Sequence, residues 1–240
     1  MQNTFTVNWR RYAQTYDILL EYNPFYQQLF KEVIAEVKQW DIKKDDFIAD
    51  IGAGTGNYSI KMAQLFPQAE IFHIDNDGGM NAVTRDKIEK TPLRNHHFLE
   101  KDIEDVYMAS NSLRAIISIH ALYIFQDPKM VLTYMFNWLE FGGYAIFVDP
   151  GRVANMLNWQ LAIGQHLIRK YGLRKTMEIM KQAREINDQN AYIRERQLRG
   201  ELWTHSHQEF CEAVNEAGFT IISSKKTFRG ISDLVIARKI

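Results

Sequence analysis

The stretch that most constrains the fold runs from Phe47 to Asn57 and reads FIADIGAGTGN. Its apolar half predicts a short buried strand, and its alternate glycines predict a tight turn, Gly52 to Gly56, before a helix that starts near Tyr58. Glycine is needed where the backbone takes a positive φ or passes close to a ligand, because a Cβ atom would collide there. A second strand, Ala69 to Asp75, ends in a carboxylate where the hydroxyls of a ribose would lie. This order predicts a nucleotide-type binding site.

The glycine spacing separates two classes of cofactor. A dinucleotide turn of the pattern Gly-x-Gly-x-x-Gly would require glycine at position 57, which is Asn57. Here the third glycine is Gly56, and Asp50 stands two positions before the first glycine. The segment from Asp50 to Gly56, DIGAGTG, resembles the first motif of class I S-adenosylmethionine-dependent methyltransferases of the small-molecule type. The alternatives are an NAD(P) site and a purely structural glycine turn.

The resemblance implies both a fold and a set of cofactor contacts. The fold class is α/β, a Rossmann-like doubly wound seven-stranded sheet that is parallel with an antiparallel last strand, with helices on both faces and a helical cap insertion. Asp50 would help to hold the amino group of S-adenosyl-L-methionine, and Asp75 would take both ribose hydroxyls. The product cofactor would be S-adenosyl-L-homocysteine. The residues assigned to the cofactor in this region are Asp50, Gly52, Gly54, Gly56, Asp75 and Asn76.

An aromatic stripe marks the first predicted helix. Trp9, Tyr12 and Tyr16 recur at helical spacing, which is typical of a helix packed on the core. The segment from Tyr12 to Asp17, YAQTYD, also matches one that folds over the cofactor as a lid in many small-molecule methyltransferases. Tyr12 and Tyr16 therefore join the predicted cofactor contacts. A second amphipathic helix is predicted over Phe25 to Trp40.

Two later strand ends add candidate site residues. A third strand, His97 to Glu100, precedes Asp102 and Ile103, whose position resembles the adenine-binding segment of the family. The fourth strand, Leu113 to Ile119, is followed by His120. Because ligands bind at the carboxyl ends of the strands in open α/β sheets, His120 could contact the cofactor or act as a general base. A hydrogen-bonded structural histidine is the alternative.

The segment after the fifth strand predicts an inserted cap. That strand is expected over Tyr144 to Val148, after a turn at Gly142 and Gly143. Three helical stretches follow, and their apolar markers are Leu157, Leu161, Ile168, Met177 and Met180. The predicted division is a helical lid over 1–45, a cofactor-binding core over 46–150, the cap over 151–204, and the end of the core over 205–240. This last part comprises a helix capped by Ser206 and an antiparallel hairpin.

The predicted cap is basic, although the charges of the whole chain balance. The chain has 29 basic and 29 acidic residues, which gives no global sign of nucleic-acid binding, yet 151–201 carries ten basic residues against five acidic ones. One interpretation is a solvated helical face. The other is that arginines clamp a carboxylate or phosphate of an anionic substrate. The candidate substrate contacts are Tyr123, His166 and Arg152.

The predicted function is methyl transfer to a small organic molecule, with O-methylation of a carboxyl or hydroxyl favoured over C- or N-methylation. His120 and Tyr16 are the candidate catalytic residues. A methyltransferase of a peptide or protein terminus and a non-catalytic cofactor-binding module are the alternatives. No third ligand accompanies His205 and His207, so no metal is expected. The lone Cys211 and the lack of a long apolar stretch predict a cytoplasmic protein without a membrane span.

Overall fold

The described part of the chain is built on one seven-stranded sheet. The computed structural model describes residues 9–91 and 93–240, apart from the side chains of residues 10, 11 and 14. The strand order is β3-β2-β1-β4-β5-β7-β6, and β7 alone of these described strands runs antiparallel to its neighbours. The predicted fold class is confirmed. The strands are β1 (Phe47–Ile51), β2 (Glu70–Ile74), β3 (His96–Leu99), β4 (Leu113–Ile119), β5 (Leu139–Pro150), β6 (Thr220–Thr227) and β7 (Ser232–Arg238).

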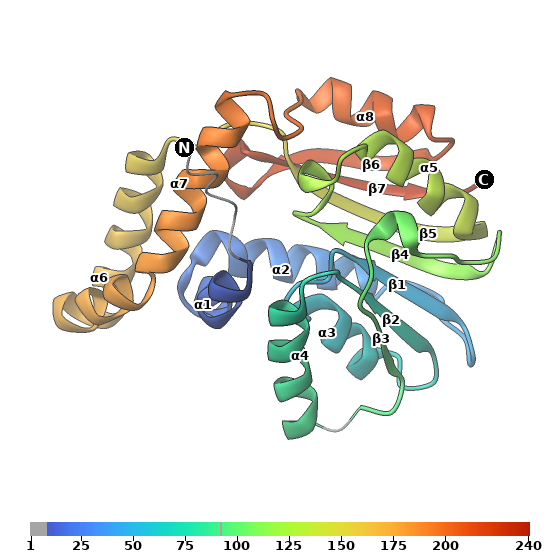
Figure 1. Ribbon diagram of the computed structural model, residues 1–240, viewed down its shortest axis with the longest axis horizontal. Coiled ribbons are helices and arrows are strands. Elements are labelled where there is room, and N and C mark those ends of the chain that lie inside the picture. Colours follow the sequence, from blue (N-terminus) through green and yellow to red (C-terminus); the bar gives the residue numbers. More distant parts are fainter. Residues whose placement is uncertain (1–8, 92) are drawn as a thin grey trace, which may run out of the picture.

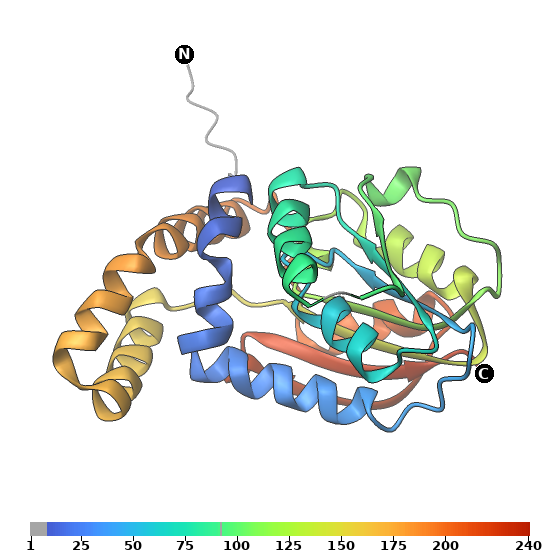
Figure 2. The same ribbon diagram turned by 90° about the horizontal axis from the view of Figure 1, so that it is seen from below.

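Helices cover both faces of this sheet (Figures 1 and 2). The helices are α1 (Trp9–Tyr22), α2 (Pro24–Val37), α3 (Asn57–Leu65), α4 (Gly78–Lys90), α5 (Pro128–Trp138), α6 (Met156–Gln182), α7 (Arg184–Leu198) and α8 (His207–Glu216). Three short 3₁₀ turns are η1 (Ile103–Asp105), η2 (Leu122–Ile124) and η3 (Phe228–Gly230). Apolar side chains of α2 and α3 pack on one face, and those of α5 and α8 pack on the other. The apolar surface that is buried on both faces stabilises the fold, because such burial is the main favourable term in folding.

The chain reverses its winding direction between β1 and β4. From β1 it proceeds outward to β2 and β3, and from β4 it proceeds the opposite way to β5. The loops that leave the carboxyl ends of these two strands therefore diverge, and a crevice forms between them. This crevice is the place where a ligand is expected in a doubly wound sheet.

The predicted start of the fifth strand is wrong. β5 begins at Leu139 and continues through Gly142, where a turn was expected. Gly142 has φ +76° and lies within an irregularity of the pairing, since Leu113 pairs with Leu139 while Ala115 pairs with Tyr144. The glycine pair therefore accommodates a bulge within one long strand.

The cap is two long helices, one of them broken. α6 is interrupted at Gly172, which has φ +76° and ψ 170°, and α7 follows at once. Four of the five apolar markers are exposed, namely Leu157, Leu161, Ile168 and Met177. The side chains that α6 buries are Leu167, Thr176 and Ile179. Because α6 carries apolar residues on more than one face, periodicity alone does not identify its buried side.

α1 lies between the cap and the core, with α7 on one side and α4 on the other (Figures 1 and 2). Tyr12 and Ala13 of α1 form a small apolar cluster with Met80 of α4 and Ile186 of α7. The predicted capping box of α8 is confirmed, with Ser206 as its N-cap. The division of the chain into lid, core, cap and end of core stays a prediction. No helix in residues 9–91 or 93–240 has the length and apolar character needed to span a membrane.

Candidate functional site

The glycine loop after β1 takes its shape from left-handed backbone at three positions. Gly52 has φ +68°, and a Cβ atom there would lie 2.3 Å from the Cβ of Ala121. Gly56 has φ +75°, and its Cβ would lie 2.4 Å from Cγ2 of Thr84. Gly54, with φ +56°, would meet only Met80 Sδ at 4.0 Å. Gly52 and Gly56 are thus required by packing, while Gly54 faces open space.

That open space is a cavity of about 430 Å³ at the carboxyl ends of β1, β2 and β4, which we call the carboxylate cavity. A volume of this order suits a small-molecule ligand. The residues predicted for the cofactor that line it are Asp50, Gly52, Gly54, Asp75, Asn76, Asp102, Ile103, His120 and Tyr16. Two others do not line it: Gly56 packs against α4, and Tyr12 lies in the neighbouring cavity.

Asp50 is buried at the end of β1 without a cationic partner in the described structure. Its Oδ2 atom accepts no hydrogen bond from any described group, while the carboxyl accepts the backbone N–H of Ser59 in the first turn of α3. Burial, and to a lesser extent the nearby Asp75, raise the pKa of this carboxyl to about 8. Because an unpaired buried carboxylate is costly, a cationic group in the cavity would fit beside Asp50.

The carboxylate of Asp75 is held in place by two backbone N–H groups. Its Oδ2 accepts the N–H of Gly54 at 2.8 Å, and its Oδ1 accepts the N–H of Asp77 at 2.9 Å. Burial raises the pKa of the Asp75 carboxyl. Each oxygen retains lone pairs, so the carboxylate can accept two further hydrogen bonds. Beside it, Asn76 donates through Nδ2 to Asp102 Oδ1, which joins the ends of β2 and β3.

A second cavity of about 220 Å³ lies beneath the cap, and we call it the cap cavity. It is lined mainly by aromatic and aliphatic side chains of α1, α6 and α7, with no Asp, Glu or Lys among its described lining residues. Its aromatic residues are Trp9, Tyr12, Tyr16, Tyr22, Tyr26, Tyr123, Trp159 and Phe228. Four residues, Trp9, Tyr16, Tyr26 and His120, line both cavities. The two cavities therefore adjoin at this shared wall.

His120 is held rigidly in that wall. His120 has φ +56°, which is uncommon outside glycine, and its backbone N–H donates to the carbonyl oxygen of Val148 at 2.7 Å. Nε2 lies 2.9 Å from Ser232 Oγ. Burial lowers the pKa of His120 to about 4, so the imidazole is neutral near pH 7. Burial raises the pKa of Tyr16, so its phenol keeps its proton there.

The predicted substrate contacts have three different environments. Tyr123 lines the cap cavity, as expected. Arg152 also lines it, but its guanidinium is engaged with Asp233 through Nη1 at 2.5 Å and Nη2 at 3.0 Å, and Nε donates to Gly230 O. His166 lines neither cavity. The arginine that sequence reasoning offered to a substrate anion is thus bound to a carboxylate of the protein itself.

A buried ionic network holds the two ends of the cap, and sequence reasoning missed it. Asp149 at the end of β5 lies 3.3 Å from Nε2 of His205, and Asp233 of β7 lies 2.8 Å from Nδ1 of His207. Together with Arg152 these groups surround two fully buried carboxylates. Burial raises the pKa of Asp149 to about 6. The acid near the end of β5 was the available signal, but its partner in this network, His205, lies 56 positions later in the chain.

Asp17, the last residue of the YAQTYD segment, fastens α1 to the core. Its Oδ1 accepts Thr55 Oγ1 at 2.8 Å and Asn57 Nδ2 at 3.2 Å. Its Oδ2 lies 2.7 Å from Nζ of Lys87 in α4. On the cap side, Tyr12 donates its hydroxyl to Asn190 Oδ1 of α7 at 2.9 Å. α1 is thus tied to the glycine loop, to α4 and to the cap.

Comparison with known proteins agrees with this geometry. Residues 48–143 match the sequence profile of a family described as "Methyltransferase domain". The chain is 27% identical over 146 residues to malonyl-[acyl-carrier protein] O-methyltransferase 1 of Ilyobacter polytropus, covering 60% of this chain and 51% of that protein. It is 31% identical over 96 residues to trans-aconitate 2-methyltransferase of Deinococcus radiodurans, covering 40% of this chain and 34% of that protein. The chain spans about half or less of the length of these relatives.

The fold resembles that of a solved methyltransferase over nearly the whole chain. Magnesium protoporphyrin IX methyltransferase of Synechocystis PCC 6803, solved with bound S-adenosylhomocysteine, superposes with a TM-score of 0.64 at 14% identity, covering 96% of this chain and 93% of that one. The sheet, the glycine loop and the matched residues define a methyltransferase domain. Residues 48–143 match the methyltransferase-domain family, and the fold of the described chain resembles that of a solved S-adenosylmethionine-dependent methyltransferase.

Proposed function

We propose that this protein transfers a methyl group from S-adenosylmethionine to a small, largely apolar organic molecule bound in the cap cavity. The observation that carries the proposal is the shared wall of Trp9, Tyr16, Tyr26 and His120 between an acid-lined cavity and an apolar one. A cofactor in the first and a substrate in the second would meet at this wall. The proposal also extends to this chain what its relatives' names say of them.

The residues of the carboxylate cavity fit the cofactor. The free Oδ2 of Asp50 would accept the amino group, and Asp75 would accept the two ribose hydroxyls. Asp102 and Ile103 lie together on η1 and its preceding residue, where an adenine would be held between a polar and an apolar group. When bound, the cofactor would supply an activated methyl group on a good leaving group.

The protein's own contribution is alignment and exclusion of water. The aromatic side chains of Trp9, Tyr16 and Tyr26 screen the shared wall from solvent, and placing two reactants in line can lower a barrier by roughly 7 to 11 kcal/mol. The neutral imidazole of His120 can accept a hydrogen bond from a hydroxyl nucleophile in the cap cavity. The protonated phenol of Tyr16 can orient a partner by donating or accepting a hydrogen bond, but it does not remove a proton.

The mainly aromatic and aliphatic lining of the cap cavity favours a substrate with a largely apolar skeleton. Arg152 is engaged with Asp233, which weakens the interpretation that it clamps a substrate anion. Amide groups of Asn187 and Asn190 on α7 are available to recognise a polar substituent. We therefore propose O-methylation of a hydroxyl or carboxyl carried on an apolar skeleton. The position of the cavity between α1 and the cap helices supports a small molecule over a peptide terminus laid across an open groove.

Filling the cap cavity tests the substrate half of the proposal. Ile193 of α7 lines this cavity, and Leu198 on the same helix is exposed. We expect Ile193→Phe to reduce methyl transfer to apolar phenols and acids at least tenfold while leaving the affinity for S-adenosylhomocysteine unchanged, because only the substrate volume is reduced. Product is measured with radiolabelled cofactor. The matched control, Leu198→Phe, keeps full activity, and equal loss in both variants would exclude the cap cavity as the substrate site.

Cofactor binding is expected to release a proton from Asp50. In the free protein its pKa of about 8 keeps the carboxyl protonated at pH 7, and a bound ammonium group would lower that pKa. Affinity for S-adenosylhomocysteine should therefore increase as pH rises towards 8 and level off above it. Calorimetric titration in buffers of different ionisation enthalpy measures the release, expected to be about one proton at pH 7. Asp50→Asn should abolish this proton release, and Asp102→Asn should retain it. If the Asp50→Asn variant still released a proton on binding S-adenosylhomocysteine, the proton would come from another group.

A further inference from the structure

The outer side of α6 is exposed and apolar. Of the twelve large hydrophobic side chains that are exposed in the described residues, five lie on this one helix: Leu157, Leu161, Ile168, Leu173 and Met177. We call them the α6 stripe. Before the break at Gly172 its members are spaced by four and seven residues, and after it by four, so each half presents them along one side. Exposed apolar side chains gathered on one helix in this number indicate an interaction site.

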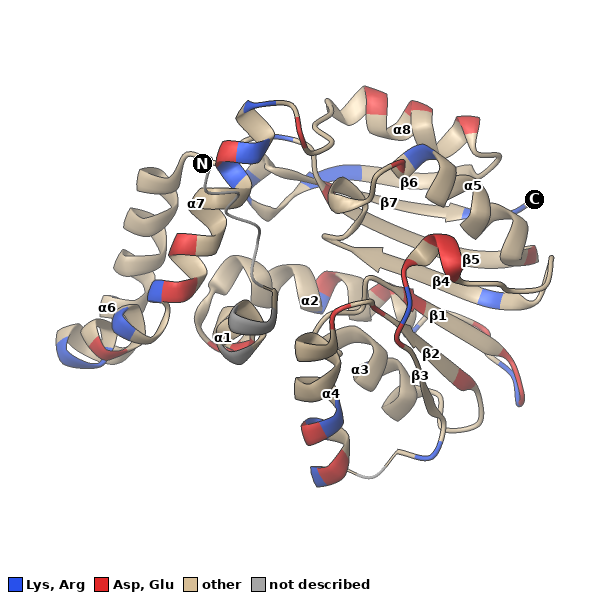
Figure 3. Cartoon of the chain, in the orientation of Figure 1, with Lys and Arg blue, Asp and Glu red and all other residues tan. Residues whose placement is uncertain are grey.

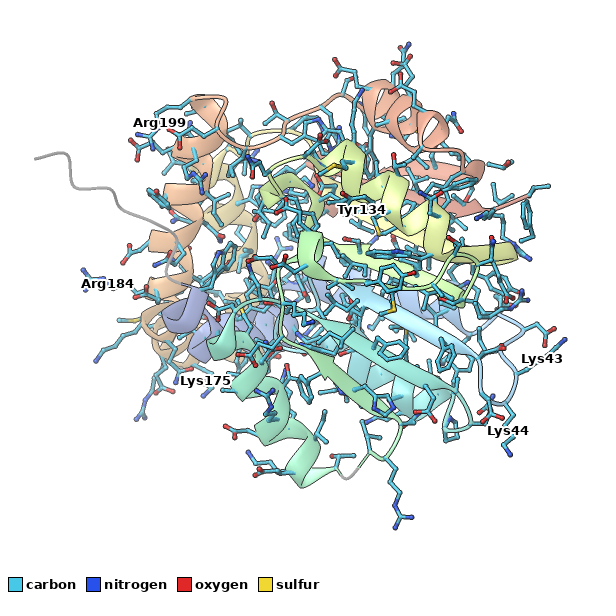
Figure 4. The ribbon with its side chains drawn as sticks, turned by 45° about the vertical axis from the view of Figure 1, so that its right-hand side comes forward. Lys43, Lys44, Tyr134, Lys175, Arg184 and Arg199 are labelled. Atoms are coloured by element: carbon cyan, nitrogen blue, oxygen red, sulfur yellow. The ribbon has the colours of Figure 1, made fainter. Side chains whose placement is uncertain are left out.

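The same helix is strongly basic. It carries five basic residues and one acidic residue, Glu178: the basic residues are Arg169, Lys170, Arg174, Lys175 and Lys181. Glu178 lies 3.6 Å from Arg174 and 3.5 Å from Lys175, so it offsets one charge of the five. Figure 3 shows Lys and Arg concentrated at the outer end of α6, and Figure 4 shows Lys175 and Arg184 at this end of the molecule.

The inner side of α6 faces the cap cavity. Met156, Trp159 and Ile163 of this helix line that cavity, while Leu157 and Leu161 point away from it. The cap cavity and the α6 stripe therefore lie on opposite sides of the same helix. Figures 1 and 2 place α6 at the extreme end of the molecule, beyond α1 and away from the sheet, where a broad flat partner would meet no other part of the core.

We infer that the α6 stripe docks this protein on the surface of a bilayer that contains anionic lipids. An amphipathic helix with apolar residues on one side and Lys and Arg beside them lies in the interface of such a bilayer. The basic residues complement the negative headgroups. A second copy of the chain is disfavoured as the occupant, because pairing α6 with α6 would bring five basic residues of each copy together with only one acid. Insofar as the proposed apolar substrate is correct, docking would place its cavity beside the membrane.

Vesicle flotation tests the inference without relying on catalysis. We expect the full chain to float with vesicles of phosphatidylcholine and phosphatidylglycerol in equal amounts, and to bind vesicles of phosphatidylcholine alone much more weakly. Leu161→Gln combined with Leu173→Gln should weaken binding to the mixed vesicles by about tenfold or more, because two apolar side chains leave the interface. Arg174→Gln combined with Lys175→Gln should weaken it by about fivefold per charge, and added salt should reduce the difference.

Matched controls lie elsewhere on the surface. Ile222 of β6 is 58% exposed, close to the 65% of Leu161 and the 64% of Leu173, so Ile222→Gln should bind vesicles like the unchanged chain. Lys43 and Lys44 lie at the opposite end of the molecule (Figure 4), and Lys43→Gln with Lys44→Gln controls for net charge. Unchanged affinity for S-adenosylhomocysteine verifies folding in every variant.

Three results would overturn the inference. One is equal flotation of the Leu161/Leu173 variant and the unchanged chain. A second is no flotation of the unchanged chain with mixed vesicles. A third is a dimer in analytical ultracentrifugation that the same two substitutions dissociate, which would assign the α6 stripe to a second copy. Failure of methyl transfer alone, with flotation intact, would count against the proposed function and not against docking.

Discussion

Replacement of Asp75 by alanine is expected to weaken binding of S-adenosylhomocysteine by roughly 10²- to 10⁴-fold. Its carboxylate is buried at the end of β2 and is oriented by the N–H groups of Gly54 and Asp77, so no other described acid can take its place without moving the loop. Loss of two charge-assisted hydrogen bonds costs about 1.5 to 3 kcal/mol each. Calorimetric titration of the purified variant measures the effect.

A matched acid in the same cavity controls for charge. Glu104 lines the carboxylate cavity from η1 but is exposed, so Glu104→Gln removes one negative charge without altering the glycine loop. We expect its affinity to change less than threefold because exposed charges are screened. The affinity of Asp75→Asn should lie between those of Asp75→Ala and Glu104→Gln, since asparagine keeps one acceptor oxygen. Equal affinities for Asp75→Ala and the unchanged chain would remove Asp75 from the site.

Replacement of Arg152 by alanine is expected to lower the free energy of unfolding by about 3 to 5 kcal/mol. Asp233 is fully buried, and without the guanidinium its carboxylate would be left with only the two histidines nearby. Removing one member of a buried pair is costly because the other charge stays desolvated. Urea denaturation followed by circular dichroism measures the change.

An exposed ion pair provides the comparison. Lys129 and Glu216 lie 3.0 Å apart, both mostly exposed, so Lys129→Ala should cost about 0 to 1 kcal/mol. Combining Arg152→Ala with Asp233→Asn should cost less than the sum of the two single changes, since the second removes the stranded charge. Simple additivity, or a loss for Arg152→Ala as small as that for Lys129→Ala, would contradict the assignment of a buried ionic network.

The fold could be predicted largely because its signals are local. Buried strands in a parallel sheet read as short apolar runs, and the strand over Leu113 to Ile119 is found where it was predicted. The placement of Asp50 and Asp75 at one edge also follows from local patterns, because the carboxyl ends of parallel strands meet there. The roles of these acids stay predictions that the titrations above test.

The cap could not be predicted in the same way because its contacts are distant in sequence. Arg152 is paired with Asp233, eighty-one positions later, and Tyr12 with Asn190, 178 positions later. A helix that is apolar on two sides gives no sign of which side a distant segment will cover, so the exposure of the α6 stripe does not follow from the sequence pattern.

The position of α1 has a kinetic consequence. Its Trp9 and Tyr16 line both cavities, and Asp17 and Tyr12 tie it to the core and to the cap. Lifting this one helix would open both compartments together, so exchange of the methylated product and of the spent cofactor would share a single opening rate. Steady-state turnover would then report the motion of α1 whenever methyl transfer is faster than that opening.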